Sequence, residues 1–358
     1  MKVSSFFVTN RKVFLPNRDN LATVMLYYYL LITNEGMNMK KLIFLINPAA
    51  QSGNAMQIWQ KFEAYLKGKQ IDYQAQISTR PRDIYNWSYI WQKHNSYNSV
   101  LVILGGDGSL NEAVNGQLAA NIGWSAPIAY IPAGSGNDFA RAYNLSNNLQ
   151  PEVIIPQLVT AIETEQVQQL DIGRMLDRVN HTRRYFVNNL GVGFDAATVA
   201  ATNDSTLKNS LNRLHLGKLA YFLSLFGVLR TQDTFNVSLK SDQGQVQFNH
   251  GYLLTFSNHP YFGGGVQIMP DANPTDGKMD LIIIEKRNMP QLLHTLFKVL
   301  RSEHYGMQQV YRWTSDKYEM VIPRLEYGHV DGEELGVHAF DFEVTSQKHS
   351  FYLITTDK

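Results

Sequence analysis

The chain has 358 residues, of which 44% are hydrophobic and 12% aromatic, enough for the cores of two ordinary domains. Lysine plus arginine number 32 against 31 for aspartate plus glutamate, so the formal net charge of +1 excludes a global field that would attract nucleic acid. The chain has no cysteine, which excludes disulfides, cysteine-ligated zinc and thiol nucleophiles and fits a cytoplasmic protein. Its longest apolar runs, residues 24–32 and 219–229, are too short to span a bilayer, so we expect a soluble or peripheral protein.

Residues 1–39 resemble nothing that follows them and consist of a basic, polar start and then an apolar run. Because Met37 and Met39 stand immediately before a clean first strand, we interpret this segment as an extension, or a misplaced start, outside the fold. A peripheral strand or helix is the alternative. A signal peptide would be poorly formed, because no small-residue cleavage site follows the apolar run.

The first half of the chain alternates strands and helices. Strands are predicted at residues 41–47, 73–78, 100–104 and 127–131, and helices at 56–67, 82–94 and 109–116, with a further helix from Phe139. Four such units predict an α/β sheet whose parallel strands carry ligand loops at their carboxyl ends. Three of these loops, residues 47–53, 105–109 and 134–138, are rich in small and polar residues, and we expect them to converge on one edge.

The motif GGDGSLNEAVNG follows the most apolar of these strands. Gly105 to Gly108 can turn sharply and bring backbone N–H groups against an anion, and Ser109 could cap the helix that follows. Asp107 would repel a bare phosphate, which suggests a bound cation or hydroxyl and hence a metal–nucleotide complex. A purely structural loop is the alternative. The motif is neither GxGxxG nor GxxxxGK[ST], which argues against a Rossmann dinucleotide site and a Walker A kinase.

The loop after the fourth strand, Gly134-Ser135-Gly136-Asn137-Asp138, again allows a ligand to approach closely. Ser135 offers a hydroxyl and a backbone donor to phosphate. Asn137 or Asp138 either binds ligand or merely caps the next helix, and the residues leave this open.

Past about Val167 the pattern changes to a β-rich second domain. Strands are predicted at residues 185–190, 235–239, 251–256, 278–284 and 318–322, with helices only at 207–229 and 290–301. The turn PDANPTDGKMD carries the hard oxygen donors that Mg²⁺ or Ca²⁺ prefers, although a plain Asp-Gly hairpin is the alternative. HVDGEEL places two acids around a glycine. Such turns are usually only solvated, but one carboxylate could accept a hydroxyl proton.

These motifs, in this order and spacing, resemble the diacylglycerol kinase catalytic family, which includes bacterial lipid kinases and sphingosine kinases. The resemblance rests on NPAAQSG, GGDGSLNEAVNG, IPAGSGNDFAR, LDIG, PDANPTDGKMD and VDGE and covers residues 41–353. It implies an ATP-binding α/β domain formed by residues 40–166 and 336–358 and a β-sandwich lipid-binding domain at residues 167–335. The active site would lie in the cleft between them.

The resemblance also implies roles for individual residues. Glu333 would be the general base, with Asp331 and Asp107 as further catalytic residues. Asn273, Asp276 and the backbone carbonyl of Lys278 would hold a structural Mg²⁺. Ser109 and Ser135 stand where the family usually has threonine, and the first loop departs from the family by an extra residue and the lack of a second glycine. The ATP contacts would fall on Asn47, Pro48, Gly53, Thr79, Gly106, Asp107, Gly108, Ser109, Leu110, Asn111, Glu112, Gly134 and Ser135.

The predicted function is an ATP-dependent lipid kinase that uses Mg²⁺ and works in the cytoplasm, at the inner face of the membrane. The alternatives are an NAD kinase-like enzyme and a non-catalytic nucleotide- or lipid-binding protein. Which lipid is phosphorylated does not follow from the sequence, and a homodimer is left open. Residues 205–232 carry Lys208, Arg213, Lys218 and Arg230 and no acid, and we expect this segment to be either a membrane contact or a buried helix.

Overall fold

The computed structural model describes residues 40–94, 99–203 and 227–355. The expected N-terminal extension lies outside these residues, as does most of the basic segment expected to contact a membrane. Within the described part, no helix is long and apolar enough to cross a bilayer.

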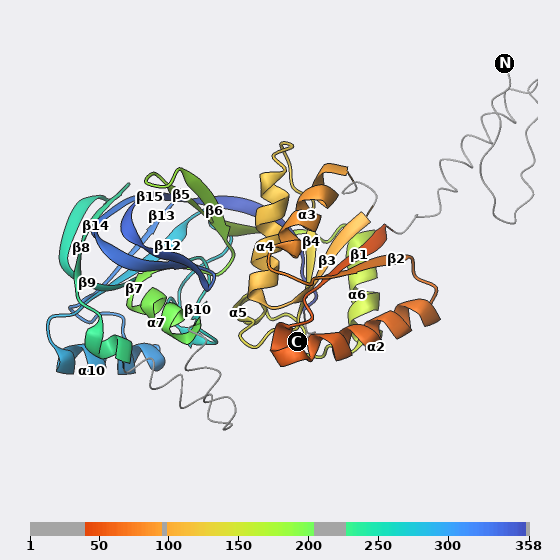
Figure 1. Cartoon of the computed structure of the whole chain (residues 1–358), viewed down its shortest axis with the longest axis horizontal. Coiled ribbons are helices and arrows are strands. Elements are labelled where there is room, and N and C mark those ends of the chain that lie inside the picture. Colours follow the sequence, from red (N-terminus) through yellow and green to blue (C-terminus); the bar gives the residue numbers. More distant parts are fainter. Residues whose placement is uncertain (1–39, 95–98, 204–226, 356–358) are drawn as a thin grey trace, which may run out of the picture. The chain divides into compact units, whose positions relative to one another are not determined.

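Four parallel strands form the first half of the fold: β1 (Lys41–Ile46), β2 (Tyr73–Ile77), β3 (Ser99–Gly105) and β4 (Ile128–Pro132) (Figure 1). They lie in the order β2-β1-β3-β4, and every pairing is parallel, as the alternation of strands and helices predicted. The carboxyl ends meet at one edge, because Asn47 donates its backbone N–H to Leu104 and Ala133 donates to Gly105. The three predicted ligand loops therefore begin side by side.

Helices cover both faces of this sheet because successive residues of a strand point to opposite faces. Leu42, Phe44 and Ile46 pack in one cluster with α2 (Ala55–Gly68) and α6 (Pro151–Glu163). Leu45 packs on the other face with α3 (Asp83–His94), α4 (Asp107–Ala119) and α5 (Asp138–Ala142). The apolar run of β3 is buried throughout because both faces are covered.

The second half is built from antiparallel strands packed around a central apolar cluster, with a second apolar cluster beside it, which confirms a β-rich, sandwich-like second half. The central order is β13-β12-β9-β7-β14-β15, with β8 beside β9 and β14, β5 beside β15, and β6 beside β5. The bounds are β5 (Gln168–Asp177), β6 (Thr182–Phe186), β7 (Asn189–Gly193), β8 (Phe235–Ser241), β9 (Gly244–Ser257), β12 (Met279–Glu285), β13 (Val310–Ser315), β14 (Lys317–Val330) and β15 (Glu333–Tyr352).

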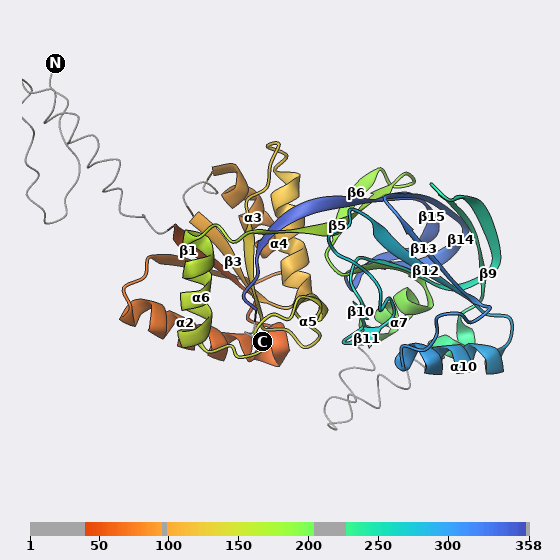
Figure 2. The same ribbon diagram turned by 180° about the vertical axis from the view of Figure 1, so that it is seen from behind.

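Two helices and short elements complete the described chain. The helices α7 (Phe194–Asn203) and α10 (Met289–Leu300) lie on the same side of the β-rich half, as both views show (Figures 1 and 2). A short hairpin of β10 (Tyr261–Phe262) and β11 (Val266–Gln267) lies near α10, and a 3₁₀ turn, η1 (Ala50–Gly53), follows β1.

Strand β15 connects the two halves of the fold. Its first part pairs antiparallel with β14, its later part pairs with β5, and Phe351 and Tyr352 pair in parallel with β4. The strand is continuous across residues 335 and 336, where the second domain is predicted to end and the first to resume. The domain boundaries themselves stay a prediction.

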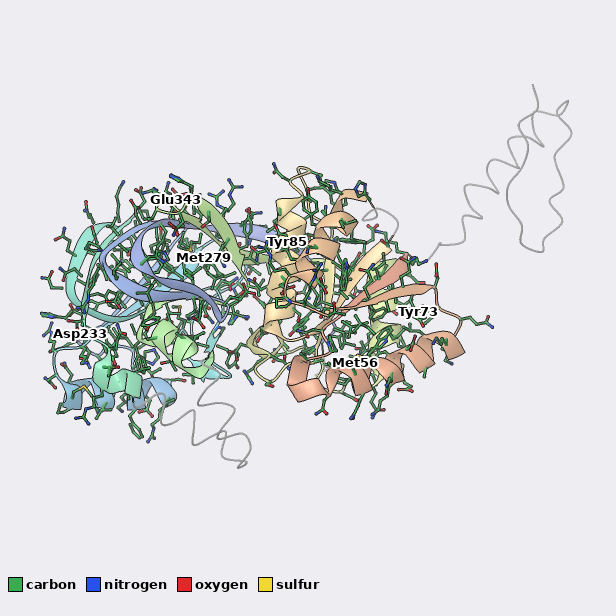
Figure 3. The ribbon with its side chains drawn as sticks, in the orientation of Figure 1. Met56, Tyr73, Tyr85, Asp233, Met279 and Glu343 are labelled. Carbon is green, nitrogen blue, oxygen red and sulfur yellow. The ribbon has the colours of Figure 1, made fainter. Side chains whose placement is uncertain are left out.

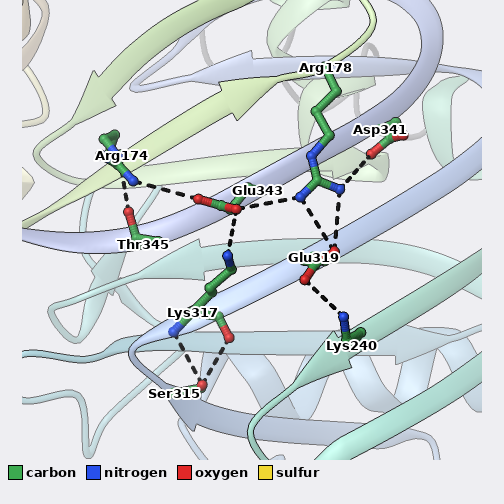
Figure 4. Close-up of polar contacts among 9 residues, drawn as sticks. All are labelled: Arg174, Arg178, Lys240, Ser315, Lys317, Glu319, Asp341, Glu343 and Thr345. Atoms are coloured by element: carbon green, nitrogen blue, oxygen red, sulfur yellow. Dashed lines mark hydrogen bonds and ion pairs between the residues drawn. The ribbon is translucent and has the colours of Figure 1, made fainter.

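Charged side chains on β5, β8, β14 and β15 form a surface network (Figure 4). Arg178 lies 3.4 Å from carboxylate oxygens of Glu319, Asp341 and Glu343, and Lys317 pairs with Glu343 at 2.8 Å. Such pairs are screened by solvent and contribute about 1 kcal/mol or less each. They favour the observed register of the strands, while burial of the apolar cluster supplies most of the stability.

Three local expectations were wrong. Residues 185–190 are not one strand, because β6 ends at Phe186 and β7 begins at Asn189. Ser109 does not cap α4, since that helix already begins at Asp107 and the capping position is Gly106. The second half has more helix than expected, because α7 follows β7 directly.

Candidate functional site

The glycine loops after β3 and β4 touch each other. A Cβ atom built on Gly134 would lie 2.6 Å from the Cα of Gly106, and one built on Gly106 would lie 3.3 Å from the Cα of Gly134. Side chains at these two positions would therefore push the loops apart. Helix α4 starts at this contact, and no side chain caps it. Its N-terminus is thus open to an anion, and the positive end of the helix dipole favours one there.

The first predicted ligand loop is bonded to this cradle. Asn47 donates its side-chain N–H to the hydroxyl of Ser109 at 3.0 Å, and its side-chain oxygen accepts from the backbone of Ala49 at 3.0 Å. The structure thus brings two of the predicted ATP contacts together. Ser135 lies in the neighbouring loop with an exposed side chain.

Thr79 lies beside α3, where its hydroxyl is already engaged. Both its backbone N–H and its hydroxyl donate to the carboxylate of Asp83. These donors, the backbone of Thr79 first, lower the pKa of Asp83. The contact holds the start of α3, so an ATP contact through the Thr79 hydroxyl would require this bond to rearrange.

Asp107 has one carboxylate oxygen that is bonded and one that is not. Its Oδ2 accepts the backbone N–H of Asp138 at 2.9 Å, whereas its Oδ1 is buried without a hydrogen-bond partner among the described residues. Burial, with the nearby carboxylates of Asp138 and Asp331, raises the pKa of Asp107 to about 6. A buried acceptor of this kind is costly unless a ligand satisfies it. Oδ1 can accept from a hydroxyl or bind a divalent cation.

The VDGE box forms the turn between β14 and β15. Val330 pairs with Glu333, and the two residues between them, Asp331 and Gly332, have φ values of 48° and 82°. Two positive φ angles in a two-residue loop define a type I′ turn, for which Asp-Gly is a preferred sequence. The turn places residues 331 and 333 in different surroundings.

The carboxylate of Asp331 holds this turn in place. It accepts backbone N–H groups from Val187, Asn188 and Asn189 at 2.7 to 2.9 Å and the side-chain N–H of Asn111 at 2.7 Å. Burial raises the pKa of Asp331, while these donors act in the opposite direction. With its oxygens occupied, Asp331 has a structural role, and its predicted catalytic role stays a prediction.

Glu333 is exposed at the start of β15 and lines a cavity of about 740 Å³. Partial burial and the neighbouring Glu112 raise the pKa of Glu333, and Arg184 and Arg82 offset part of that shift. Glu112 in turn accepts backbone N–H groups of Arg82 and Tyr85. Tyr85 lies on α3 (Figure 3). We call this cavity the Glu333 pocket. Its other lining residues include Asn111, Asn115, His181, Arg183 and Tyr185.

A second cavity of about 340 Å³ has both polar and apolar lining residues. Asp107, Gly136 and Asp138 from the cradle line it, together with Asp331 and Gly332 of the turn. We call this cavity the Asp107 pocket. Its apolar wall comes from the β-rich half and consists of Phe194, Val199, Leu253 and Phe262.

A buried polar group forms part of the Asp107 pocket. Asp195 accepts the hydroxyl of Thr255 at 2.8 Å and lies 3.3 Å from Nε2 of His329. The other ring nitrogen of His329 accepts the backbone N–H of Gly332 at 3.3 Å. Because Nδ1 is the acceptor, Nε2 carries the hydrogen and donates to Asp195. His329 thereby connects Asp195, which lines the pocket, to the VDGE turn.

The predicted metal turn lies apart from both pockets. The side-chain oxygen of Asn273 accepts from Thr275, and Asp276 accepts the backbone N–H of Lys278 at 2.9 Å. The ammonium of Lys348 bonds Asp171 and the carbonyl of Thr275. Among the described residues, no group of three or more histidine or carboxylate side chains could hold a metal ion.

The structure thus brings some predicted residues together and separates others. Asp107 and Asp331 share one pocket, whereas Glu333 lines the other with Asn111 and Glu112. The sequence analysis missed Asp195 and His329. The available signals were the placement of Asp195 two residues after the end of the short, buried strand β7 and of His329 two residues before Asp331.

Comparison with known families matches both halves of the chain. Residues 41–175 match the diacylglycerol kinase catalytic domain, and residues 188–349 match the YegS C-terminal NAD kinase beta sandwich-like domain. A solved structure described as a diacylglycerol kinase from Bacillus anthracis str. Sterne superposes with a TM-score of 0.64 at 21% identity. The match covers 89% of this chain and 97% of that one, and it shows the fold.

Curated relatives extend the match. A diacylglycerol kinase of Bacillus subtilis strain 168 is 27% identical over 265 residues, which is 72% of this chain and 78% of the relative. A diacylglycerol kinase of Staphylococcus aureus strain JH9 is 32% identical over 211 residues, 59% of this chain and 60% of the relative. A further Bacillus subtilis relative, YtlR, is 23% identical over 299 residues, 83% of this chain and 94% of YtlR.

Proposed function

This chain belongs to the diacylglycerol kinase family of lipid kinases, and from that premise we propose that it transfers the γ-phosphate of MgATP to the hydroxyl of diacylglycerol or a related lipid. The observation that carries the proposal is the Asp107 pocket. A lipid alcohol has one polar end that must meet the phosphate donor and an apolar remainder that must leave water. The pocket offers both kinds of lining, because Asp107 and Asp138 of the phosphate cradle and the apolar side chains of Phe194, Leu253 and Phe262 line the same cavity.

ATP would bind at the edge where the three ligand loops meet. The open N-terminus of α4 favours phosphate oxygens, and the lack of side chains at Gly106 and Gly134 lets the two loops pack against each other beside it. The side chains of Asn47 and Ser109, already bonded to each other, would position the polyphosphate. Phosphoryl transfer depends mainly on such positioning and on neutralisation of charge.

The unpaired oxygen of Asp107 fits a divalent cation, because Mg²⁺ prefers hard oxygen ligands and this carboxylate oxygen lacks a partner among the described residues. When bound there, Mg²⁺ would neutralise charge on the phosphates. Because the pKa of Asp107 is raised, a bound cation would favour the ionised carboxylate, and ionisation would in turn strengthen cation binding.

Glu333 is proposed to accept the proton of the lipid hydroxyl as the oxygen–phosphorus bond forms. A carboxylate with a reference pKa of about 4.3 is ionised near neutral pH, and the rise in the pKa of Glu333 makes its ionised form a better proton acceptor. Glu333 follows Gly332, which lines the Asp107 pocket, so a change in side-chain rotamer or closure around the substrates must bring its carboxylate to the hydroxyl. The proposal places the enzyme in the cytoplasm at the inner face of the membrane, where ATP and the lipid meet.

The direct experiment is a radiolabelled kinase assay with the full chain, MgATP and a panel of acceptors: diacylglycerol, monoacylglycerol, a sphingoid base, a polyprenol and NAD. We expect label in a lipid product and none in NAD. Label in NAD would favour the NAD kinase-like alternative, and ATP binding without transfer to any acceptor would favour a non-catalytic protein.

A structural Mg²⁺ at Asn273, Asp276 and Lys278 is a separate proposal. The ammonium of Lys348 already donates to the carbonyl of Thr275 in this turn. The carboxylate of Asp276 is exposed, and one of its oxygens accepts the backbone N–H of Lys278. The test is the shift of melting temperature on adding Mg²⁺. A larger shift in the wild type than in Asp276→Ala supports the site, and equal shifts oppose it.

A further inference from the structure

Helix α10 exposes a row of large apolar side chains. Met289, Leu293, Phe297 and Leu300 have 37%, 49%, 54% and 69% of their surface exposed. Their spacing of four, four and three residues puts them on one face of the helix. We call this row the α10 stripe. Single exposed apolar residues are ordinary, but a continuous row of four on one helix indicates an interaction surface.

The helix is firmly attached through its other face. Leu292 and Val299 are buried in a cluster with Tyr252, Ile282 and Ile284. The side chain of Asn288 caps the N-terminus by accepting the backbone N–H of Gln291 at 3.0 Å. The orientation of α10 is therefore fixed by packing, and the stripe faces away from the protein as a stable feature.

Positive charge accompanies the stripe. Residues 289–300 contain Lys298 and no acidic residue, and Arg287 and Arg301 flank them. Glu303 pairs with Lys298 and Arg301, and Arg287 lies 3.6 Å from Glu285, so some of this charge is balanced. Lys286 points elsewhere, because its ammonium donates to the carbonyl of Gln232 at 3.0 Å and lies over the ring of the buried Tyr252. Residues 285–303 carry four cations against two acids in all. An apolar face bordered by basic side chains is typical of helices that lie in an anionic membrane interface.

Helix α10 packs on the same apolar cluster that supplies part of the apolar wall of the Asp107 pocket. The cluster that buries Leu292 and Val299 also contains Phe194 and Leu253, and both of these line the pocket. Figures 1 and 2 show α7, which carries Phe194, and α10 on the same side of the β-rich half. A surface that contacts the stripe would therefore lie on the side of the fold from which the pocket takes its apolar wall.

We propose that the α10 stripe docks the protein on an anionic lipid bilayer, with Met289, Leu293, Phe297 and Leu300 inserted among the acyl chains and Lys298 and Arg301 at the headgroups. The proposal rests on the proposed function, because an enzyme whose acceptor stays in a bilayer must sit on it. The mixed apolar and cationic chemistry favours a lipid surface over a second copy of this chain, which would bring like charges together.

The test is co-sedimentation of the full chain with phosphatidylcholine vesicles that contain about 30% phosphatidylglycerol. Leu293→Ser/Phe297→Ser should weaken the apparent affinity at least about tenfold, because two side chains lose their burial in the acyl region. Lys298→Gln/Arg301→Gln should weaken it a few-fold and reduce its dependence on salt. If the first variant melts well below the wild type, Phe297→Ser alone replaces it.

The matched control is Ile90→Ser/Val179→Ser, which removes two side chains that are 52% and 50% exposed elsewhere on the surface. It should bind vesicles as the wild type does. A wild type that does not sediment with these vesicles, or a stripe variant that binds like the control, overturns the proposal. So does a stripe variant that turns a dimer into a monomer, as measured by light scattering, while its vesicle binding is unchanged.

Kinase assays separate this proposal from the proposed function. With a water-soluble short-chain diacylglycerol, the stripe variant should turn over at the wild-type rate, whereas with diacylglycerol in vesicles its rate should fall at least about tenfold. If the wild type phosphorylates no lipid, the proposed function fails. The vesicle sedimentation would still decide the role of the stripe.

Discussion

The two pockets beside the β14–β15 turn differ in how strongly they disfavour the ionised form of a carboxylate. In the Asp107 pocket, Asp107 keeps a buried oxygen without a partner among the described residues, and burial raises its pKa to about 6. In the Glu333 pocket, Glu333 is exposed and has Arg184 and Arg82 near it to counter the effect of Glu112. The β14–β15 turn thus lies between two different acids. Burial disfavours the charge of Asp107, whereas solvent and nearby cations stabilise the charge of Glu333.

The comparison shows where each residue can act. A buried carboxylate whose charge is disfavoured, such as Asp107, is retained where a bound ligand compensates for the cost. Such groups are typical of binding sites. A solvated carboxylate such as Glu333 costs little when no substrate is present and suits a proton acceptor that must approach the substrate. Asp331 belongs to neither class, because four N–H donors already satisfy it.

The largest expected effect is that of Asp107→Asn on turnover. The amide keeps the shape of the side chain and removes the negative charge that Mg²⁺ and the acceptor hydroxyl would use, so kcat should fall about 1000-fold. The measurement is kcat at saturating MgATP. Ser135→Ala, in the neighbouring loop, serves as the milder control. A variant within about tenfold of the wild type would remove Asp107 from the catalytic machinery.

Glu333→Gln should come next, with a loss in kcat of about 100-fold, because an amide cannot accept the hydroxyl proton. The KM for ATP should stay near its wild-type value, since the nucleotide is expected on the other loops. The adjacent acid offers a matched comparison in Glu334→Gln, which should leave kcat unchanged. If Glu333→Gln is as active as Glu334→Gln, the proton goes elsewhere and the two pockets do not share the reaction.

Much of the fold could be predicted from the sequence because its signals are local. The apolar runs of β1, β3 and β4 lead into loops that open with small or amide residues, and this pattern is typical of parallel strands that deliver ligand loops. The 20-residue β15 could not be predicted as one strand, because its exposed first part and its buried last part follow different patterns. Its pairing partners, β14, β5 and β4, include strands that are distant in sequence.

The site could be predicted only in part, for a similar reason. Motifs identify which residues are chemically apt, and they led to Asp107 and the glycine loops as candidates, while the family resemblance selected Glu333 from the VDGE box. Which cavity each side chain lines depends on the type I′ turn and on packing across the fold, and no motif encodes that. Asp195 and His329 contact each other although 134 residues of chain separate them, so the sequence around either residue does not reveal the pair.

Asp107→Asn should also stabilise the protein, by about 1–2 kcal/mol at pH 7. The pKa rise from 3.8 to about 6 means that ionised Asp107 destabilises the folded state above pH 6, by up to about 3 kcal/mol before partial solvation is allowed for. The folded state binds the proton more tightly than the unfolded state, so this penalty grows as pH rises from about 4 to about 6 and is absent below about 4.

Urea unfolding at pH 7 and at pH 4 measures this effect. The variant should exceed the wild type in free energy of unfolding at pH 7, and the difference should vanish near pH 4. A variant that is less stable than the wild type at pH 7 would show that Asp107 is not held in an unfavourable state. The contrast between the two pockets would then lose its basis.

The smallest expected effect is that of Arg184→Gln, which alters the surroundings of Glu333 alone. Burial, Glu112 and Asp331 raise the pKa of Glu333, and Arg184 and Arg82 lower it, so loss of one arginine raises it further. The acid limb of the kcat profile should therefore move to higher pH, with activity below the wild type on the acid limb and equal to it on the plateau above that limb. Arg183→Gln, one residue away and exposed, is the matched control and should leave the profile in place. A uniform loss at every pH would mean that Arg184 binds a substrate instead of tuning Glu333.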